Sequence, residues 1–168
     1  MDLISRWARE WMVTINRTKT VATCFSLSPR KEEFTLHIEG TNIPHQDTPT
    51  YLGVKLDRRL TWNPQINTMH SKAVRRMAVM KKLAGTKWGA NMETLTQVYT
   101  GSVRPHMEYA STAWSTATKT NMENLAKVQN TAMRIITGGM KTTPISAMEK
   151  TTGLLSLQEI RDEKLLRQ

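Results

Sequence analysis

The hydrophobic pattern of the chain changes its period once, near residues 60–63, and this change constrains the fold more than any other feature. Before it, short runs rich in β-branched residues are separated by turn residues, and one segment with helical periodicity lies near the N-terminus. After it, apolar residues recur every three or four positions. The sequence therefore predicts an α+β chain in two parts. Residues 1–62 are expected to form a partial antiparallel sheet with one helix, and residues 63–168 an all-α helical region.

The N-terminal part is predicted to hold one amphipathic helix and several short strands. Leu3, Trp7 and Trp11 recur every four residues and define the apolar stripe of the helix. Residues 16–19 are a predicted turn, and residues 21–27 and 34–38 are predicted strands. A hairpin turn is expected at residues 39–42. The expected sheet is therefore small and antiparallel.

A further strand is predicted over residues 48–57, where the side chains alternate between two faces. One face is expected to join the core and carries Leu52, Val54 and Leu56. The other face carries Tyr51, Gly53, Lys55 and Asp57, and Arg58 follows directly. The residues alone leave open whether this face, with its aromatic ring, bare backbone position and cation, is solvated surface or lies against a ligand.

Caps and breakers predict the helix boundaries in the C-terminal part. Asn63 before Pro64 and Asn91 are expected to cap two helices. Residues 120–123 and 156–159 have the pattern of capping boxes, and Gly138 with Gly139 is expected to stop the helix that the first box opens. Pro105 is expected to interrupt or kink a helix, and the next helix is expected to carry Met107, Ala110 and Trp114.

No catalytic or metal-binding pattern appears in the sequence. Cys24 is the only cysteine, which excludes an intramolecular disulfide and a zinc site made of thiolates. The four histidines are dispersed, and neither a glycine-rich phosphate loop nor a nucleophile elbow is present. We therefore expect no catalytic residue, metal or cofactor in this chain. No segment resembles a signal peptide or a bilayer span, so an intracellular location without membrane contact is expected.

The chain is strongly basic, with 24 lysines and arginines against 14 acidic residues and a net charge of +10. Such an excess favours polyanionic partners, because basic side chains neutralise phosphates and release counterions. On the helix predicted from residue 64, the face opposite the methionine-rich stripe carries Lys72, Arg75 and Lys82, bordered by Arg76 and Lys81. No acidic residue occurs from residue 63 to residue 92. A solvated outer face is the ordinary alternative, but the one-sided charge favours a surface that follows a nucleic-acid backbone.

Five short motifs occur in a familiar order, at residues 11–20, 51–62, 103–114, 128–134 and 137–144. With them, the chain resembles over essentially its whole length the distal palm and thumb region of non-LTR retrotransposon reverse transcriptases, of jockey-like and related elements. The resemblance implies that residues 1–62 are a palm remnant, with part of the palm sheet, and that residues 63–168 are the thumb and the region after it. It also implies three partners: an RNA template, a DNA primer and the upstream remainder of the polymerase.

The resemblance further implies which chemistry is missing. In that family a pair of aspartates on a hairpin holds two Mg²⁺ ions for phosphoryl transfer, and this chain contains no Asp-Asp pair. The chain is therefore expected to be a fragment of an RNA-directed DNA polymerase that contacts primer–template but is inactive alone, with Mg²⁺ belonging only to the intact polymerase. A non-catalytic nucleic-acid-binding protein derived from a retroelement is the alternative, and a basic helical adaptor for proteins is a third.

Individual residues receive roles from the same resemblance. Lys19 matches a palm lysine near the triphosphate, although an ordinary turn lysine is an equal alternative. Residues 51–54 match the primer-grip hairpin, in which Gly53 lets the backbone approach the primer and Tyr51 offers a flat packing surface. Lys55 and Arg58 are then expected to reach phosphates. With the helical cations, the predicted nucleic-acid-binding residues are Lys19, Tyr51, Gly53, Lys55, Arg58, Lys72, Arg75, Arg76 and Lys82.

Overall fold

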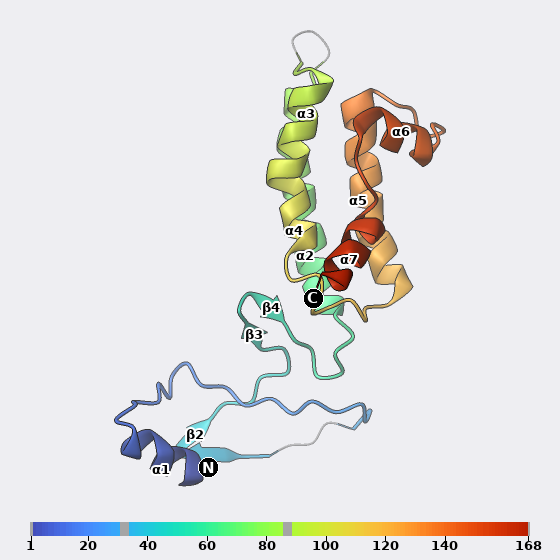
Figure 1. The fold of residues 1–168 in the computed structure, drawn as a ribbon. Helices are drawn as coiled ribbons and strands as arrows, with labels where there is room; N and C mark the ends of the chain where they lie inside the picture. Colours follow the sequence, from blue (N-terminus) through green and yellow to red (C-terminus); the bar gives the residue numbers. More distant parts are fainter. Residues whose placement is uncertain (1, 31–33, 86–88, 168) are drawn as a thin grey trace. The chain divides into compact units, whose positions relative to one another are not determined.

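The computed structural model describes residues 2–30, 34–85 and 89–167 (Figure 1). The chain falls into two compact units, Met1–Pro64 and Gln65–Gln168, here named the N-terminal unit and the helical unit. The predicted α+β class is confirmed, because the described residues form several helices and two small antiparallel sheets. The assignment of the two parts to a palm and a thumb stays a prediction.

The N-terminal unit contains one helix and two separate two-stranded sheets. The helix is α1 (Asp2–Glu10). The first sheet pairs β1 (Leu36–Ile38) with β2 (Thr41–Ile43), and the second pairs β3 (Thr50–Tyr51) with β4 (Val54–Lys55). A small core forms beside the first sheet from Ala22, Ile38 and Ile43, with Ile15, Phe34 and Leu36 packed against it.

Both hairpins turn on two residues that have positive φ. Glu39 and Gly40 have φ values of 46° and 77°, and Leu52 and Gly53 have values of 46° and 79°. Two-residue loops of this kind match the twist of the flanking strands, and glycine adopts the second position without a steric penalty. The first hairpin turn is confirmed. The second confirms that residues 51–54 form a hairpin, as the resemblance implies, and shows that the single strand predicted from the alternation is wrong, because the chain turns at Gly53.

The same turn changes the surroundings of Leu52. This side chain lies at the hairpin tip and is 73% exposed, whereas Val54 is buried. The prediction that Leu52 joins the core is therefore wrong, and the prediction for Val54 is confirmed.

Residues 21–27 are extended but do not form the predicted strand. They contribute one isolated parallel bridge, between Ala22 and His45. The Ala22 N–H donates to the Pro44 carbonyl at 3.0 Å, and the Gln46 N–H donates to the Ala22 carbonyl at 2.9 Å. Pro44 has no N–H to donate, which restricts any longer ladder on this partner segment.

Helix α1 is confirmed, but its apolar stripe is not covered by the described residues. Leu3, Trp7 and Trp11 are 76%, 52% and 67% exposed. The buried side chains of the helix are the small ones, Ser5 and Ala8. The stripe therefore remains an exposed apolar surface of this unit.

In the helical unit, several helices pack against one long helix, α5 (Lys119–Thr137). The elements of this unit are α2 (Asn63–Leu83), α3 (Met92–Val98), the π-helix η1 (Tyr99–Val103), α4 (Arg104–Glu108), α5, α6 (Ile145–Thr152) and α7 (Leu157–Leu166). Helix α5 packs against α3, α6 and α7, as Figure 1 shows. The largest fully buried side chains, which form the core, are Trp114, Tyr99, Ile66, Met80, Met107, Leu125, Met133, Met148 and Val103.

Most of the predicted caps are present. The Asn91 side chain accepts a hydrogen bond from the Thr94 N–H at 2.8 Å, and Ser156 with Glu159 forms a complete capping box. Gly138 ends α5 with a φ of 67°. The capping box at residues 120–123 is wrong, because α5 already begins at Lys119. Thr118, whose backbone is extended, is the residue before the helix, and Asn121 lies within the helix and is buried.

Pro105 is accommodated by a widened turn. The Arg104 N–H donates to the Tyr99 carbonyl, five residues back, and η1 ends at Val103, two residues before the proline. A proline lacks an N–H and crowds the carbonyl four residues earlier, and a π-turn relieves both problems. The helix then ends at Glu108, and Ala110 has a φ of 51°. The prediction that Ala110 and Trp114 lie on a helix is therefore wrong.

Candidate nucleic-acid interface

Helix α2 presents two chemically different faces. The predicted methionine-rich stripe is confirmed as its core side, which buries Ile66, Met69, Ala73, Met77 and Met80. The exposed side carries the predicted cations Lys72, Arg75, Arg76, Lys81 and Lys82. The burial of one stripe fixes the rotation of the helix, and this rotation turns the cations to solvent.

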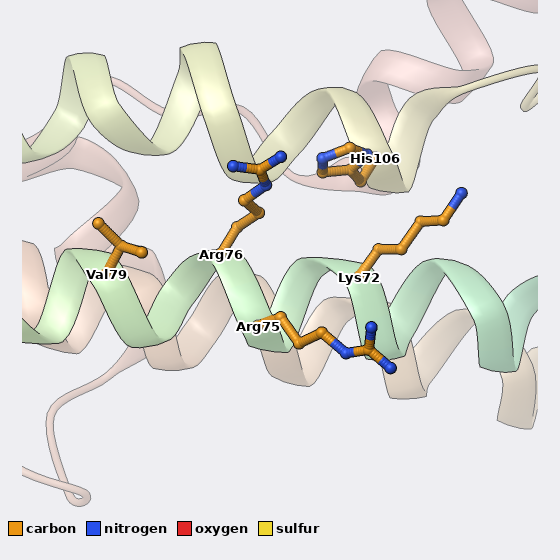
Figure 2. Close-up of a pocket in the computed structure, with 5 residues that line it drawn as sticks. All are labelled: Lys72, Arg75, Arg76, Val79 and His106. Atoms are coloured by element: carbon orange, nitrogen blue, oxygen red, sulfur yellow. The ribbon is translucent and has the colours of Figure 1, made fainter.

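Three of these cations gather around one shallow hollow of about 390 Å³ in the helical unit. Lys72, Arg75 and Arg76 line it together with Val79, and His106 of α4 completes the lining. In Figure 2 the side chains of Lys72 and Arg76 extend from α2 toward the helix that carries His106. We name this set, Lys72, Arg75, Arg76 and His106, the basic hollow.

The positive charge of the basic hollow is not neutralised by ion pairs within the part of the chain that the structure describes. Among the residues that the structure describes, no carboxylate forms an ion pair with Lys72, Arg75 or Arg76. Cations that are close to each other and lack acidic partners create a positive potential that attracts phosphates. The basic hollow can therefore hold an anionic backbone without breaking an internal ion pair.

The carboxylate on α4 is already paired. Glu108 accepts hydrogen bonds from the Arg104 guanidinium and from the Lys164 ammonium, the latter at 2.7 Å. Burial raises the pKa of Glu108, but the hydrogen bonds from these two cations outweigh it and hold the pKa below its usual value. Glu108 is thus a structural ion-pair partner that joins α4 to α7.

The sequence pattern does not identify His106, and it groups Lys82 with the other cations. No rule of sequence spacing connects residue 72 to residue 106, since tertiary packing alone brings α4 beside α2. Lys82 does not line the basic hollow. It lies with Lys81 in the last turn of α2, where positive charge is favourable at a helix C-terminus.

The remaining predicted residues belong to the N-terminal unit, and two of them lie at the tip of the second hairpin. Tyr51 is 68% exposed, and Gly53 occupies the turn. In the register of this hairpin Tyr51 pairs with Val54, and Thr50 pairs with Lys55. Directly opposed residues share a face of a sheet. Tyr51 and Lys55 therefore lie on opposite faces, and the prediction that they share one face is wrong.

Arg58 holds the backbone of a neighbouring loop. Its guanidinium donates to the carbonyls of Arg30 at 2.5 Å and Ser28 at 2.6 Å. Asp57 before it also organises the backbone, since it accepts the N–H groups of Thr61 and Trp62 at 2.9 and 2.8 Å. Burial raises the pKa of Asp57, but these hydrogen bonds outweigh it and lower the pKa. Binding of Arg58 to a phosphate would compete with the loop carbonyls.

Lys19 lies in the turn that the sequence predicts. The Asn16 side chain accepts the Lys19 N–H at 3.2 Å and the Thr18 hydroxyl at 2.8 Å, which closes the turn. The Lys19 side chain is exposed. Its role near a triphosphate stays a prediction.

Neither a metal cluster nor a membrane span is found in the described residues. Within them, no group of three or more histidine, cysteine, aspartate and glutamate side chains lies close enough to hold a metal ion. No described helix has the length and apolar character that crossing a membrane requires.

Comparison with known proteins finds that the chain is similar to parts of mobile-element polymerases. It is 29% identical over 138 residues to the probable RNA-directed DNA polymerase from transposon BS of Drosophila melanogaster, which covers 82% of this chain and 15% of that protein. Its relatives are the polymerases of non-LTR retrotransposons. The probable RNA-directed DNA polymerase from transposon X-element of the same species is 28% identical over 134 residues, or 80% of this chain and 15% of that protein.

A third relative of the same retrotransposon group matches a longer stretch. The retrovirus-related Pol polyprotein from the type-1 retrotransposable element R1 of Nasonia vitripennis is 23% identical over 172 residues, which covers 97% of this chain and 51% of that protein. No protein-family model and no solved structure matches the chain. The predicted resemblance to non-LTR retrotransposon polymerases is confirmed, while the chain spans only about 15% of the length of the two fly relatives.

Proposed function

We propose that the chain is a part of a retrotransposon RNA-directed DNA polymerase and that the basic hollow contacts the sugar–phosphate backbone of the primer–template. The observation that carries the proposal is the convergence of three cations without acidic partners and one histidine from two helices. Such contacts position a nucleic acid without reading its sequence. Binding should therefore depend strongly on salt and weakly on base sequence.

The proposal assigns no catalytic step to this chain. Two-metal phosphoryl transfer needs carboxylates that hold both ions, and the carboxylates in the described residues do not gather into such a set. Purified chain should not extend a primer on an RNA template with Mg²⁺ or Mn²⁺. Primer extension that Lys19→Ala abolishes would contradict this part of the proposal.

Salt-dependent binding tests the role of the basic hollow. We would measure the affinity of the full chain for a labelled RNA–DNA hybrid by fluorescence anisotropy at several salt concentrations. The triple variant Lys72→Gln, Arg75→Gln, Arg76→Gln should reduce the slope of log affinity against log salt by about one unit for each phosphate that it no longer neutralises. Circular dichroism would check that the variant is folded.

A matched variant controls for net charge. Lys127, Lys141 and Lys150 are exposed in the helical unit and do not line the basic hollow. Changing these three lysines to glutamine removes the same charge and should leave the slope nearly unchanged. Equal effects of the two triple variants would show that only the overall charge matters, and would refute the assignment to the basic hollow.

A further inference from the structure

A second hollow in the helical unit, of about 270 Å³, lies between α5 and α7. Helix α5 contributes Lys119 and Met122 to its lining, and α7 contributes Arg161, Asp162 and Leu165. It shares no lining residue with the basic hollow. We name it the α5–α7 hollow. Its volume is near the lower end of those that hold small molecules.

The α5–α7 hollow is lined by an arginine that is almost completely buried. Arg161 is 5% exposed, and its guanidinium lies over the Trp114 ring at 5.8 Å from the centroid. One terminal nitrogen, Nη2, donates to the Gln158 side chain at 3.2 Å. The other, Nη1, is enclosed and has no hydrogen-bond partner. A buried guanidinium nitrogen without an acceptor is unfavourable. Among the described residues Arg134 Nε is also buried without a partner, but Arg134 does not line this hollow.

The nearby carboxylates do not satisfy Arg161. The two Glu108 oxygens already accept from Arg104 and Lys164. Asp162 accepts from the Gln158 amide at 2.9 Å. Among the described residues no carboxylate forms an ion pair with Arg161. A buried cation that lacks a direct counterion is costly, and an anion from outside the protein would remove that cost.

We propose that the α5–α7 hollow binds a phosphate monoester, with the phosphate on Arg161 and Lys119 and its organic group against Met122 and Leu165. The lining carries two cations and one carboxylate. A phosphate monoester offers three strong acceptor oxygens for the guanidinium and the ammonium of this lining, whereas a carboxylate offers two. The planar guanidinium fork suits two phosphate oxygens, while Lys119 acts as a point charge.

Calorimetry with two small probes tests the site on the full chain. Adenosine 5′-monophosphate should bind, and adenosine should bind at least about tenfold more weakly, since it lacks the charged acceptor. Lys119→Gln and Arg161→Lys should each weaken binding of the monophosphate by about tenfold. Lys119 is exposed, so its substitution should preserve the fold even if the Arg161 variant does not.

Matched controls make the result specific to this hollow. Lys127→Gln changes an exposed lysine of the same helix that does not line the hollow, and should leave the affinity unchanged. The triple variant of the basic hollow should also leave the affinity for the monophosphate unchanged. Calorimetry therefore tests the α5–α7 hollow alone, and the salt dependence of hybrid binding tests the proposed function alone. Equal binding of the monophosphate and adenosine, or equal effects of Lys119→Gln and Lys127→Gln, would overturn the proposal.

A competition experiment identifies the source of the monoester. A short single strand with a 5′-phosphate that displaces the monophosphate, beside a 5′-hydroxyl strand that does not, would identify a strand end as the ligand. Failure of both strands to displace it would identify a free mononucleotide. Equal displacement by both strands would mean that backbone phosphates suffice, which overturns the assignment to a monoester.

Discussion

Tyr99 and Gln129 form a buried polar link in the core of the helical unit, and breaking it tests how this unit is held together. The Tyr99 side chain is fully buried, and its hydroxyl donates to the Gln129 carbonyl oxygen at 2.9 Å. The Gln129 amide in turn donates to the Leu155 carbonyl at 2.9 Å. Burial raises the pKa of Tyr99, so the hydroxyl stays a donor at neutral pH. The link therefore joins η1, α5 and the segment before α7.

The expected cost follows from which buried atoms are left without a partner. Tyr99→Phe keeps the ring but leaves the Gln129 oxygen without a donor, which should cost about 1–3 kcal/mol of unfolding free energy. Gln129→Leu leaves both the Tyr99 hydroxyl and the Leu155 carbonyl unpaired, and should cost roughly twice as much. The double variant leaves only the Leu155 carbonyl unpaired. Its cost should be smaller than the sum of the single costs by about 2–6 kcal/mol, the equivalent of two unpaired groups.

Urea unfolding followed by far-ultraviolet circular dichroism measures these three changes. The slope of free energy against urea should stay constant across the variants, so that the differences report stability alone. Strict additivity of the two single costs would show that the side chains do not interact. A neutral Tyr99→Phe would show that the Gln129 oxygen accepts from water or another donor instead, and would refute the reasoning.

Three further predictions concern the same unit. Glu108→Gln should lower the unfolding free energy at pH 7 by about 1–2 kcal/mol, because it weakens two charged hydrogen bonds. The loss is no larger because solvent already screens part of both interactions. Because the folded-state pKa of Glu108 is lowered, its contribution to the unfolding free energy is present above about pH 4.5, the ordinary value, and is lost as the pH falls below it. Between pH 7 and pH 3 the unfolding free energy should therefore fall less steeply in the variant than in the original chain. Gly138→Ala should destabilise by about 1–2 kcal/mol, because φ is +67° and only backbone strain opposes the new methyl group. Gly101→Ala adds a methyl group to an open helical position and should stabilise by up to about 1 kcal/mol in the same urea assay.

The sequence predicted those features of the helical unit that depend on local chemistry. The caps at Asn91 and Ser156 and the stop at Gly138 need only side chains a few residues apart, so their patterns are readable in the sequence. The buried stripe of α2 is readable for the same reason, because one periodicity spans the whole helix. The end of α4 at Glu108 is different. It depends on how the chain turns to bury Trp114, whose indole N–H donates to the Tyr109 carbonyl at 2.9 Å.

The candidate sites show the same division between local and tertiary information. The three cations of the basic hollow were predicted from their helical spacing, whereas His106 comes from another helix. Arg161 was not predicted as a ligand, because its missing hydrogen-bond partner becomes visible only when α5, α7 and Trp114 are packed together. At residues 48–57 the alternation is real but the predicted single strand is wrong. Two competing signals overlap there, and the glycine turn prevails over the strand period.

The exposed apolar stripe of α1 predicts that the full chain associates in solution. Leu3, Trp7 and Trp11 are each more than half exposed, and an exposed patch of this kind favours association. The double variant Trp7→Gln, Trp11→Gln should reduce the apparent mass measured by light scattering while leaving the helical circular dichroism signal nearly unchanged. The helices from residue 63 onward have their own caps and buried stripes, so a chain of residues 63–168 should be helical and less prone to associate. A monodisperse full chain beside an aggregated 63–168 chain would contradict this prediction, because it would show that the apolar surface of the N-terminal unit does not drive association.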